Sequence, residues 1–180
     1  LLSIPDIGWR VDAEDPTALT RILDLPGLFV TGLEYNDTNQ TLHVFCQHTE
    51  PTASCPTCRQ SSPFVHQYSR RAVRDLPWAG KPCLIEFAAR RFYCLHCRCP
   101  FREELEWLPR CSRLTGRYRM FVFAQCRKTT IQAVSRQERL GYKTLERLYY
   151  ALATEQTQTL PAKNIRLLLY TSDAADDLTR

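Results

Sequence analysis

Four of the nine cysteines form two pairs whose spacing is typical of metal ligands. Cys55 and Cys58 form one C-x2-C pair, and Cys94 and Cys97 form a second pair after a spacer of 35 residues. A C-x2-C turn aims two thiolates at one point, and two such turns complete a tetrahedral four-sulfur site that suits zinc. Such a site has no open coordination position, so we expect the zinc ion to be structural rather than catalytic. A hairpin within the long spacer would bring the two pairs together.

Other cysteine chemistry fits the pattern less well. A C-x2-C pair also occurs as a redox dithiol, but that usually needs a thioredoxin-like βαβ setting, which the surrounding sequence lacks. Buried free thiols are a second alternative, and His96 and Cys99 are rival ligands within the second pair. An odd number of cysteines without a signal peptide favours a reducing, cytoplasmic compartment. We expect the remaining cysteines to fill core positions: Cys46, Cys83, Cys111 and Cys126.

A second pattern, over residues 130–153, predicts a helix, a turn and a further helix. Thr129 or Thr130 can cap the first of these helices, and we expect Gly141 to take positive φ at the turn. Such a pair places its second helix in the major groove of DNA, with its N-terminal residues near the base edges. A preceding helix carries arginines that suit phosphate. The predicted DNA contacts are Arg113, Arg117, Arg119, Tyr142, Lys143, Thr144 and Arg147. The alternative is a plain three-helix bundle with these charges in solvent.

The elements that must position these residues change in type along the chain. Apolar and β-branched residues predict strands at residues 28–35, 41–46 and about 82–93, after a short helix at 20–25. From Cys111 onward the apolar spacing becomes helical, with the last helix over about 143–154 and its apolar face at Leu145, Leu148 and Leu152. The predicted fold class is α+β: a small strand-rich, zinc-ribbon-like module followed by an all-α helix-turn-helix module of three helices.

Charge is distributed unevenly over the 180 residues. The chain has a net charge of +5, but residues 59–150 hold 19 basic and 7 acidic side chains, and most of these cations are arginine. A block with a net charge of +12 suits a polyanionic partner such as double-stranded DNA, and a solvated arginine-rich surface is the alternative. The composition is that of a globular protein, and no apolar run is long enough to span a membrane.

Several ordered motifs resemble the N-terminal region of transposases of the ISL-three insertion-sequence type. They cover roughly residues 20–155, and the Arg74-Asp75-Leu76-Pro77-Trp78 stretch is the most specific of them. The others are Leu25-Pro26-Gly27-Leu28, Val30-Thr31-Gly32, the Cys55/Cys58 pair, Val65-His66-Gln67-Tyr68, Arg70-Arg71, Gly80-Lys81-Pro82, Arg90-Arg91-Phe92-Tyr93-Cys94 and Leu140-Gly141-Tyr142-Lys143-Thr144-Leu145-Glu146-Arg147.

The resemblance implies a zinc-binding module, a helix-turn-helix and then a catalytic Asp-Asp-Glu domain that uses Mg²⁺ to cut and join DNA. No acidic residue in 1–155 is assigned to that triad, and Asp75 is interpreted as a turn residue. In the family, second cysteine pairs are either C-x4-C or C-x2-C with an aromatic residue and an acid at set offsets. Phe101 and Glu103 stand at those offsets from Cys97, which favours Cys97 over Cys99.

These observations predict four segments. Residues 1–19 form a peripheral or non-native leader, 20–110 the zinc-binding domain, 111–155 the helix-turn-helix domain, and 156–180 a linker with a non-native tail. The predicted function is recognition of the terminal inverted repeats of a transposon, with self-association as a further expectation and no membrane partner. A stand-alone zinc-ribbon and helix-turn-helix regulator is the alternative, and a redox protein is a third class.

Overall fold

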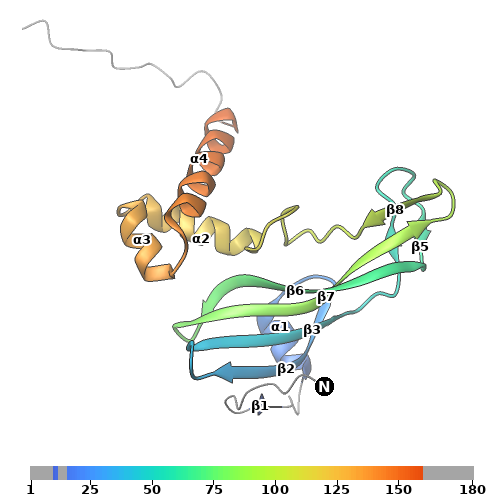
Figure 1. The fold of residues 1–180 in the computed structure, drawn as a ribbon, viewed down its shortest axis with the longest axis horizontal. Helices are drawn as coiled ribbons and strands as arrows, with labels where there is room; N and C mark the ends of the chain where they lie inside the picture. Colours follow the sequence, from blue (N-terminus) through green and yellow to red (C-terminus); the bar gives the residue numbers. More distant parts are fainter. Residues whose placement is uncertain (1–9, 12–15, 160–180) are drawn as a thin grey trace, which may run out of the picture.

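The computed structural model describes residues 10–11 and 16–159. A mixed sheet and a small two-stranded sheet precede a group of three helices (Figure 1). The strands are β1 (Arg10–Val11), β2 (Leu28–Asn36), β3 (Thr41–His48), β4 (Ala53–Ser54), β5 (Ser61–Ser62), β6 (Val65–Trp78), β7 (Lys81–Cys94) and β8 (Cys99–Arg102). The helices are α1 (Pro16–Leu23), α2 (Gly116–Cys126), α3 (Ile131–Glu138) and α4 (Tyr142–Thr159). The α+β prediction is therefore confirmed.

The main sheet has the order β1-β2-β3-β7-β6, and β8 pairs with the end of β7. We call the halves of β6 and β7 nearest the cysteine pairs their outer halves, and the halves nearest the turn between them their inner halves. All neighbouring strands are antiparallel except β3 and β7, which are parallel. The strands predicted at 28–35 and 41–46 are present as β2 and β3 and form a hairpin. Its turn is closed by the Asn36 side chain, which accepts hydrogen bonds from the backbone N–H groups of Thr38 and Asn39. Because β3 pairs with residues 83–86 and β8 with residues 91–94, β7 has different neighbours along its length.

Strands β6 and β7 form a long hairpin that sequence analysis identified only in part. The strand expected at 82–93 is present as β7, but its partner β6 was missed. The outer half of β6 is exposed and polar, so it lacks the alternation that predicts a strand. Ala79 and Gly80, both at positive φ, make the tight turn that this hairpin needs. The hairpin occupies most of the spacer between the two cysteine pairs and brings them to one end of the molecule.

The core of the sheet lies on one face of its inner half. Val30, Val44, Val73 and Ile85 are fully buried there. Helix α1 and residues 105–108 cover this face and complete the apolar cluster. The segment that follows β8 therefore returns from the cysteine end and packs on the sheet before it reaches α2 (Figure 1).

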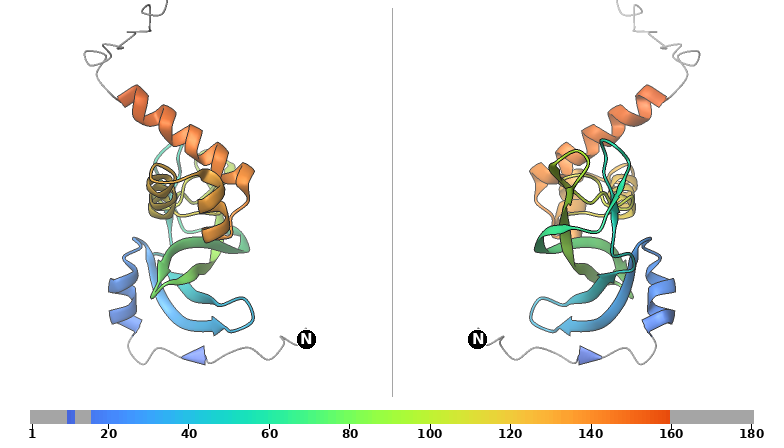
Figure 2. Two further views of the ribbon diagram at one scale, coloured as in Figure 1. Left: turned by 90° about the vertical axis from the view of Figure 1, so that its left-hand side faces the viewer. Right: turned by 90° about the vertical axis from the view of Figure 1, so that its right-hand side faces the viewer.

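The three C-terminal helices form a second core beside strand β6 (Figure 2). Thr115 caps α2 and Thr130 caps α3 through their side-chain oxygens, the latter as predicted. The expected positive φ at Gly141 is wrong, because Arg139 takes the left-handed conformation that ends α3. The expected end of the last helix near residue 154 is also wrong, because α4 continues to Thr159. The remainder of the expected linker and tail, and most of the leader, lie outside the described residues.

Candidate functional site

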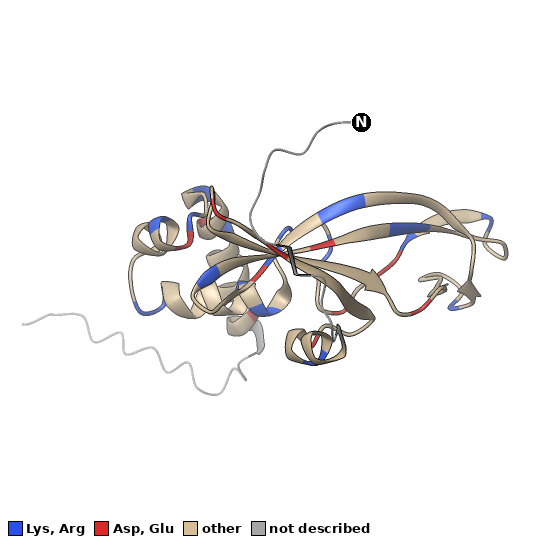
Figure 3. Cartoon of the chain, turned by 90° about the horizontal axis from the view of Figure 1, so that it is seen from below, with Lys and Arg blue, Asp and Glu red and all other residues tan. Residues whose placement is uncertain are grey.

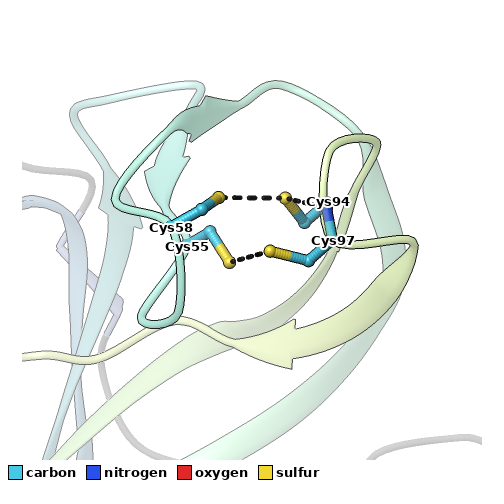
Figure 4. Close-up of side chains that lie close together, drawn as sticks. All are labelled: Cys55, Cys58, Cys94 and Cys97. Carbon is cyan, nitrogen blue, oxygen red and sulfur yellow. Dashed lines mark hydrogen bonds between the residues drawn. The ribbon is translucent and has the colours of Figure 1, made fainter.

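The two cysteine pairs meet at the open end of the β6–β7 hairpin, opposite its turn (Figure 4). The sulfur atoms of Cys55, Cys58, Cys94 and Cys97 all lie within 4.8 Å of one another. The Sγ atoms of Cys55 and Cys97 are 3.9 Å apart, and those of Cys58 and Cys94 are 3.6 Å apart. A tetrahedral site with Zn–S bonds of about 2.3 Å requires sulfur atoms about 3.8 Å apart. The four thiols therefore fit a zinc ion in both number and spacing.

Both cysteine turns have the same backbone geometry. Arg59 and Arg98, which directly follow the second cysteine of each pair, both take positive φ. The N–H of Cys97 donates to the Cys94 sulfur at 3.4 Å, and the N–H of Cys58 makes the equivalent contact to Cys55. These donors favour the thiolate form, which is the form that binds metal.

The hydrogen bonds within the cluster shift the pKa values of Cys55 and Cys97 in opposite directions. The backbone N–H of Cys58 lowers the pKa of Cys55 to about 6, against the effect of burial. The pKa of Cys97 is raised, first because of its hydrogen bond with Cys58 and then because of burial. Thiols lose their protons when they bind a metal ion, so we expect metal binding at this site to release protons.

The structure separates the clustered cysteines from the others. Cys99 lies outside the cluster, in β8 opposite Cys94, and His96 is exposed. Burial raises the pKa of the Cys46 thiol, and likewise that of Cys83, to about 12, as expected of inert core thiols. Cys126 is buried too, but Cys111 is exposed, so its predicted core position is wrong.

Helix α4 presents its polar N-terminal residues to solvent. Leu145, Leu148 and Leu152 are buried against α2 and α3, as predicted. Over the first half of α4, residues 142–150, the exposed residues are Tyr142, Lys143, Thr144, Arg147 and Tyr150. Lys143, Arg147 and Tyr150 are four and three residues apart, so they share one helix face. This part of the chain thus offers two cations and an aromatic ring on a rigid helix.

The three arginines expected to hold phosphate differ in their surroundings. Arg113 is exposed and Arg119 is half-buried. Arg117 instead forms an ion pair with Asp75, whose side chain is 3% exposed, and its Nη1 donates to the Leu23 carbonyl. In the structure the Arg117 guanidinium is therefore paired with a carboxylate, and its predicted phosphate contact stays a prediction. The structure also corrects the interpretation of Asp75 as a turn residue, because Asp75 lies buried in β6.

Sequence analysis also missed the polar contacts that join the sheet to the helices. Thr115, which caps α2, donates to Asp75 in β6 at 2.6 Å, and between α2 and α3 the Tyr118 hydroxyl donates to Glu138 at 2.8 Å. Arg74 lies 3.6 Å from the same Glu138 carboxylate and its guanidinium stacks over the Tyr118 ring. The adjacent Arg74-Asp75 pair, alternating between the two faces of a strand, is the signal that could have identified this junction.

Comparison with known proteins matches the strand-rich part and the helical part of the chain to two different transposase regions. Residues 51–97 match the family described as the zinc-finger of transposase IS204/IS1001/IS1096/IS1165, and residues 103–153 match the helix-turn-helix domain of transposase family ISL3. The transposase for insertion sequence element IS1001 of Bordetella parapertussis is 31% identical over 112 residues. That alignment covers 62% of this chain but only 28% of the relative. No solved structure matches the chain.

Proposed function

We propose that this chain, which carries the zinc-ribbon and helix-turn-helix regions of ISL3-type transposases, recognises the terminal inverted repeats of a transposable element. The observation that carries the proposal is the exposed cationic face of α4, held on a buried three-helix core. Both family matches are to transposase regions, which supports DNA binding in transposition rather than transcriptional regulation.

The helix-turn-helix contributes the sequence-reading surface in this proposal. Lys143 and Thr144 lie in the first turn of α4, and Arg147 lies one turn later, so all three can reach base edges when the helix enters the major groove. Tyr142 is exposed at the start of α4 and Arg113 is exposed before α2, and both suit phosphate contacts. Glu146, which raises the pKa of Tyr142 through its charge, gives the same face an acceptor for a cytosine amino group.

The zinc ion has a structural role in this proposal. Cys55, Cys58, Cys94 and Cys97 would hold it at the end of the β6–β7 hairpin, and zinc supplies folding free energy there. The local apolar cluster is small, with Phe92 stacked on Phe101 as its main contact. Four thiolates must stay reduced to bind metal, which supports the expected cytoplasmic compartment. None of the described helices is long and apolar enough to cross a membrane.

We place the catalytic Asp-Asp-Glu domain and its Mg²⁺ ions in the part of the parent protein beyond this region. Long-read sequencing of the source locus tests this assignment. We expect the reading frame to continue into a region with spaced Asp, Asp and Glu codons, flanked by inverted repeats. A frame that ends at Arg180 with no repeats nearby would contradict it.

Selection from a random duplex library tests the binding proposal directly. We expect the zinc-loaded chain to enrich a sequence that matches the terminal repeats of the source locus. The affinity for that duplex should exceed the affinity for a scrambled duplex by about 10³-fold or more at physiological salt. The Lys143→Ala variant should bind both duplexes more weakly, whereas Arg21→Ala, on exposed α1, should not. Equal affinity for specific and scrambled duplexes at every salt concentration would refute sequence recognition.

A further inference from the structure

One face of the β6–β7 hairpin changes from apolar to cationic along its length. On the inner half this face carries Val73, Ile85 and Phe87, which are buried under α1 and residues 105–108. The following residues on the same face, two positions apart along each strand, are more polar and more accessible. They are Arg71, Ser69 and Gln67 on β6, Ala89 and Arg91 on β7, and Arg102 on β8.

These side chains line an open cavity with a volume of about 360 Å³. Leu105, Phe87 and Glu103 also line it. Figure 3 shows cationic positions along the two long strands that carry it. Five arginines but a single carboxylate, that of Glu103, line this surface. We name it the hairpin groove.

Two of the five arginines are neutralised by carboxylates, and three are not. Arg90 pairs with Glu103, and Arg70 pairs with Glu86. Within the part of the chain that the structure describes, Arg71, Arg91 and Arg102 have no ion pair. Arg71 donates to the backbone carbonyl of Ser112, which leaves its charge uncompensated. The groove therefore has a net positive charge that the described residues do not cancel.

The register places like charges directly opposite one another. Arg91 pairs with Arg102 across β7 and β8, and with Gln67 across β6 and β7. Like charges at directly opposed positions destabilise a sheet, and neighbouring strands lie only about 4.8 Å apart. The other face of the same strands already packs Phe92 and Phe101 under the cysteine cluster. The cationic face is thus held rigid from behind and is complementary to a polyanion.

The groove also has the length and shape for a nucleic-acid backbone. Arg71 and Arg91 are four residues apart along the hairpin, which corresponds to about 14 Å. Each strand of a DNA duplex presents about four phosphates over that distance. The small residues Ser69 and Ala89 face each other between the two arginines and leave room for a backbone to approach. The hydroxyl of Ser69 and the amide of Gln67 add neutral donors that suit phosphate oxygens.

We propose that the hairpin groove is a second DNA-binding surface, which holds the phosphate backbone of the duplex read by α4. This inference rests on the proposed DNA-binding function and extends it from the helices to strands β6, β7 and β8. Arg71 bonds to Ser112, and the next residue, Arg113, is exposed immediately before α2, so the groove adjoins the helical domain. The groove lacks a base-reading element, so it should add affinity without sequence preference.

The test compares salt dependence of DNA binding between two double variants of the zinc-loaded chain. R91Q/R102Q removes two groove charges, and neither side chain makes a hydrogen bond or ion pair within the described residues. R21Q/R127Q removes the same charge from exposed positions outside the groove. Affinity for a duplex of about 30 base pairs is measured by fluorescence anisotropy across a salt series, with a specific and a scrambled sequence. Zinc content and thermal unfolding verify that each variant folds.

For R91Q/R102Q we expect the slope of log affinity against log salt to fall by about 1.8, equally for both sequences. R21Q/R127Q should keep the wild-type slope. A wild-type slope in R91Q/R102Q, or equal losses in both variants, would overturn the groove while leaving recognition by α4 intact. R147A separates the two proposals, because it should reduce the preference for the specific duplex and leave the groove contribution in place. Failure of the wild-type chain to bind either duplex would refute both proposals.

Discussion

The ion pair between Arg117 and Asp75 gives a sharp test of how the sheet is joined to the helices. Asp75 is buried, and it accepts hydrogen bonds from Thr115 and from two nitrogens of Arg117. Replacing Arg117 with Ala leaves Thr115 as the remaining described partner of a buried carboxylate. Breaking a buried ion pair from one side costs about 3–5 kcal/mol. Because the Arg117 side chain is 32% exposed, water can partly replace it, and we expect about 3 kcal/mol.

Urea unfolding of the zinc-loaded chain, followed by far-ultraviolet circular dichroism, measures this loss. In thermal unfolding, the expected fall in melting temperature is about 6–12 °C for a chain of this size. R113A, which removes a nearby exposed arginine, should change the free energy of unfolding by about 0.5 kcal/mol or less. The double variant D75N/R117A should be more stable than R117A, because a neutral amide needs no counter-charge.

The R117A variant distinguishes the structural role of Arg117 from the predicted phosphate contact. A structural residue lowers stability, and the folded fraction keeps the wild-type salt dependence of DNA binding. A phosphate contact would lower that slope by about 0.9 and leave unfolding unchanged. Unfolding of R117A within about 0.5 kcal/mol of wild type, together with a reduced slope, would refute the structural assignment.

Three further outcomes follow from the site and its supports. A zinc chelator or C55S should increase hydrogen exchange at the outer halves of β6 and β7 while the core around Ile85 stays protected. C99S should retain zinc. Global unfolding of C55S would show that the core around Ile85 depends on the zinc site. R147A should weaken specific DNA binding by about 1–3 kcal/mol with no change in melting, and an unchanged affinity would remove Arg147 from the base-reading surface. Y118F should cost about 1 kcal/mol in urea unfolding through the lost bond to Glu138, and an unchanged midpoint would show that this bond is not stabilising.

The cysteine spacing and the helical periodicity were informative because both signals are local. A C-x2-C turn fixes its own geometry within four residues, and both pairs indeed converge on one point. Leu145, Leu148 and Leu152 are buried as their spacing predicted, because a helix repeats every 3.6 residues wherever it packs. The choice of Cys97 over Cys99 depended on the family resemblance, and the cluster contains Cys97.

Strand β6 and the roles of its charged residues could not be predicted in the same way. Its outer half lacks apolar alternation, since that face is cationic and uncovered, so the usual strand signal was absent. Whether Arg117 binds phosphate or a buried carboxylate depends on Asp75, a residue 42 positions earlier in the chain. Arg70-Arg71 and Arg90-Arg91 likewise showed charge without showing which arginine of each pair is neutralised.

The sequence by itself determined the zinc ligands' type and spacing, the order of strand-rich and helical parts, and the apolar faces of the helices. These properties depend on residues within a few positions of one another. Only the tertiary structure decided which charges are compensated, because an ion pair depends on the register between strands and on the segment that packs across them. Pairing of β7 with β6 and β8 separates Arg90, which is bound to Glu103, from Arg91, which faces Arg102 in the hairpin groove.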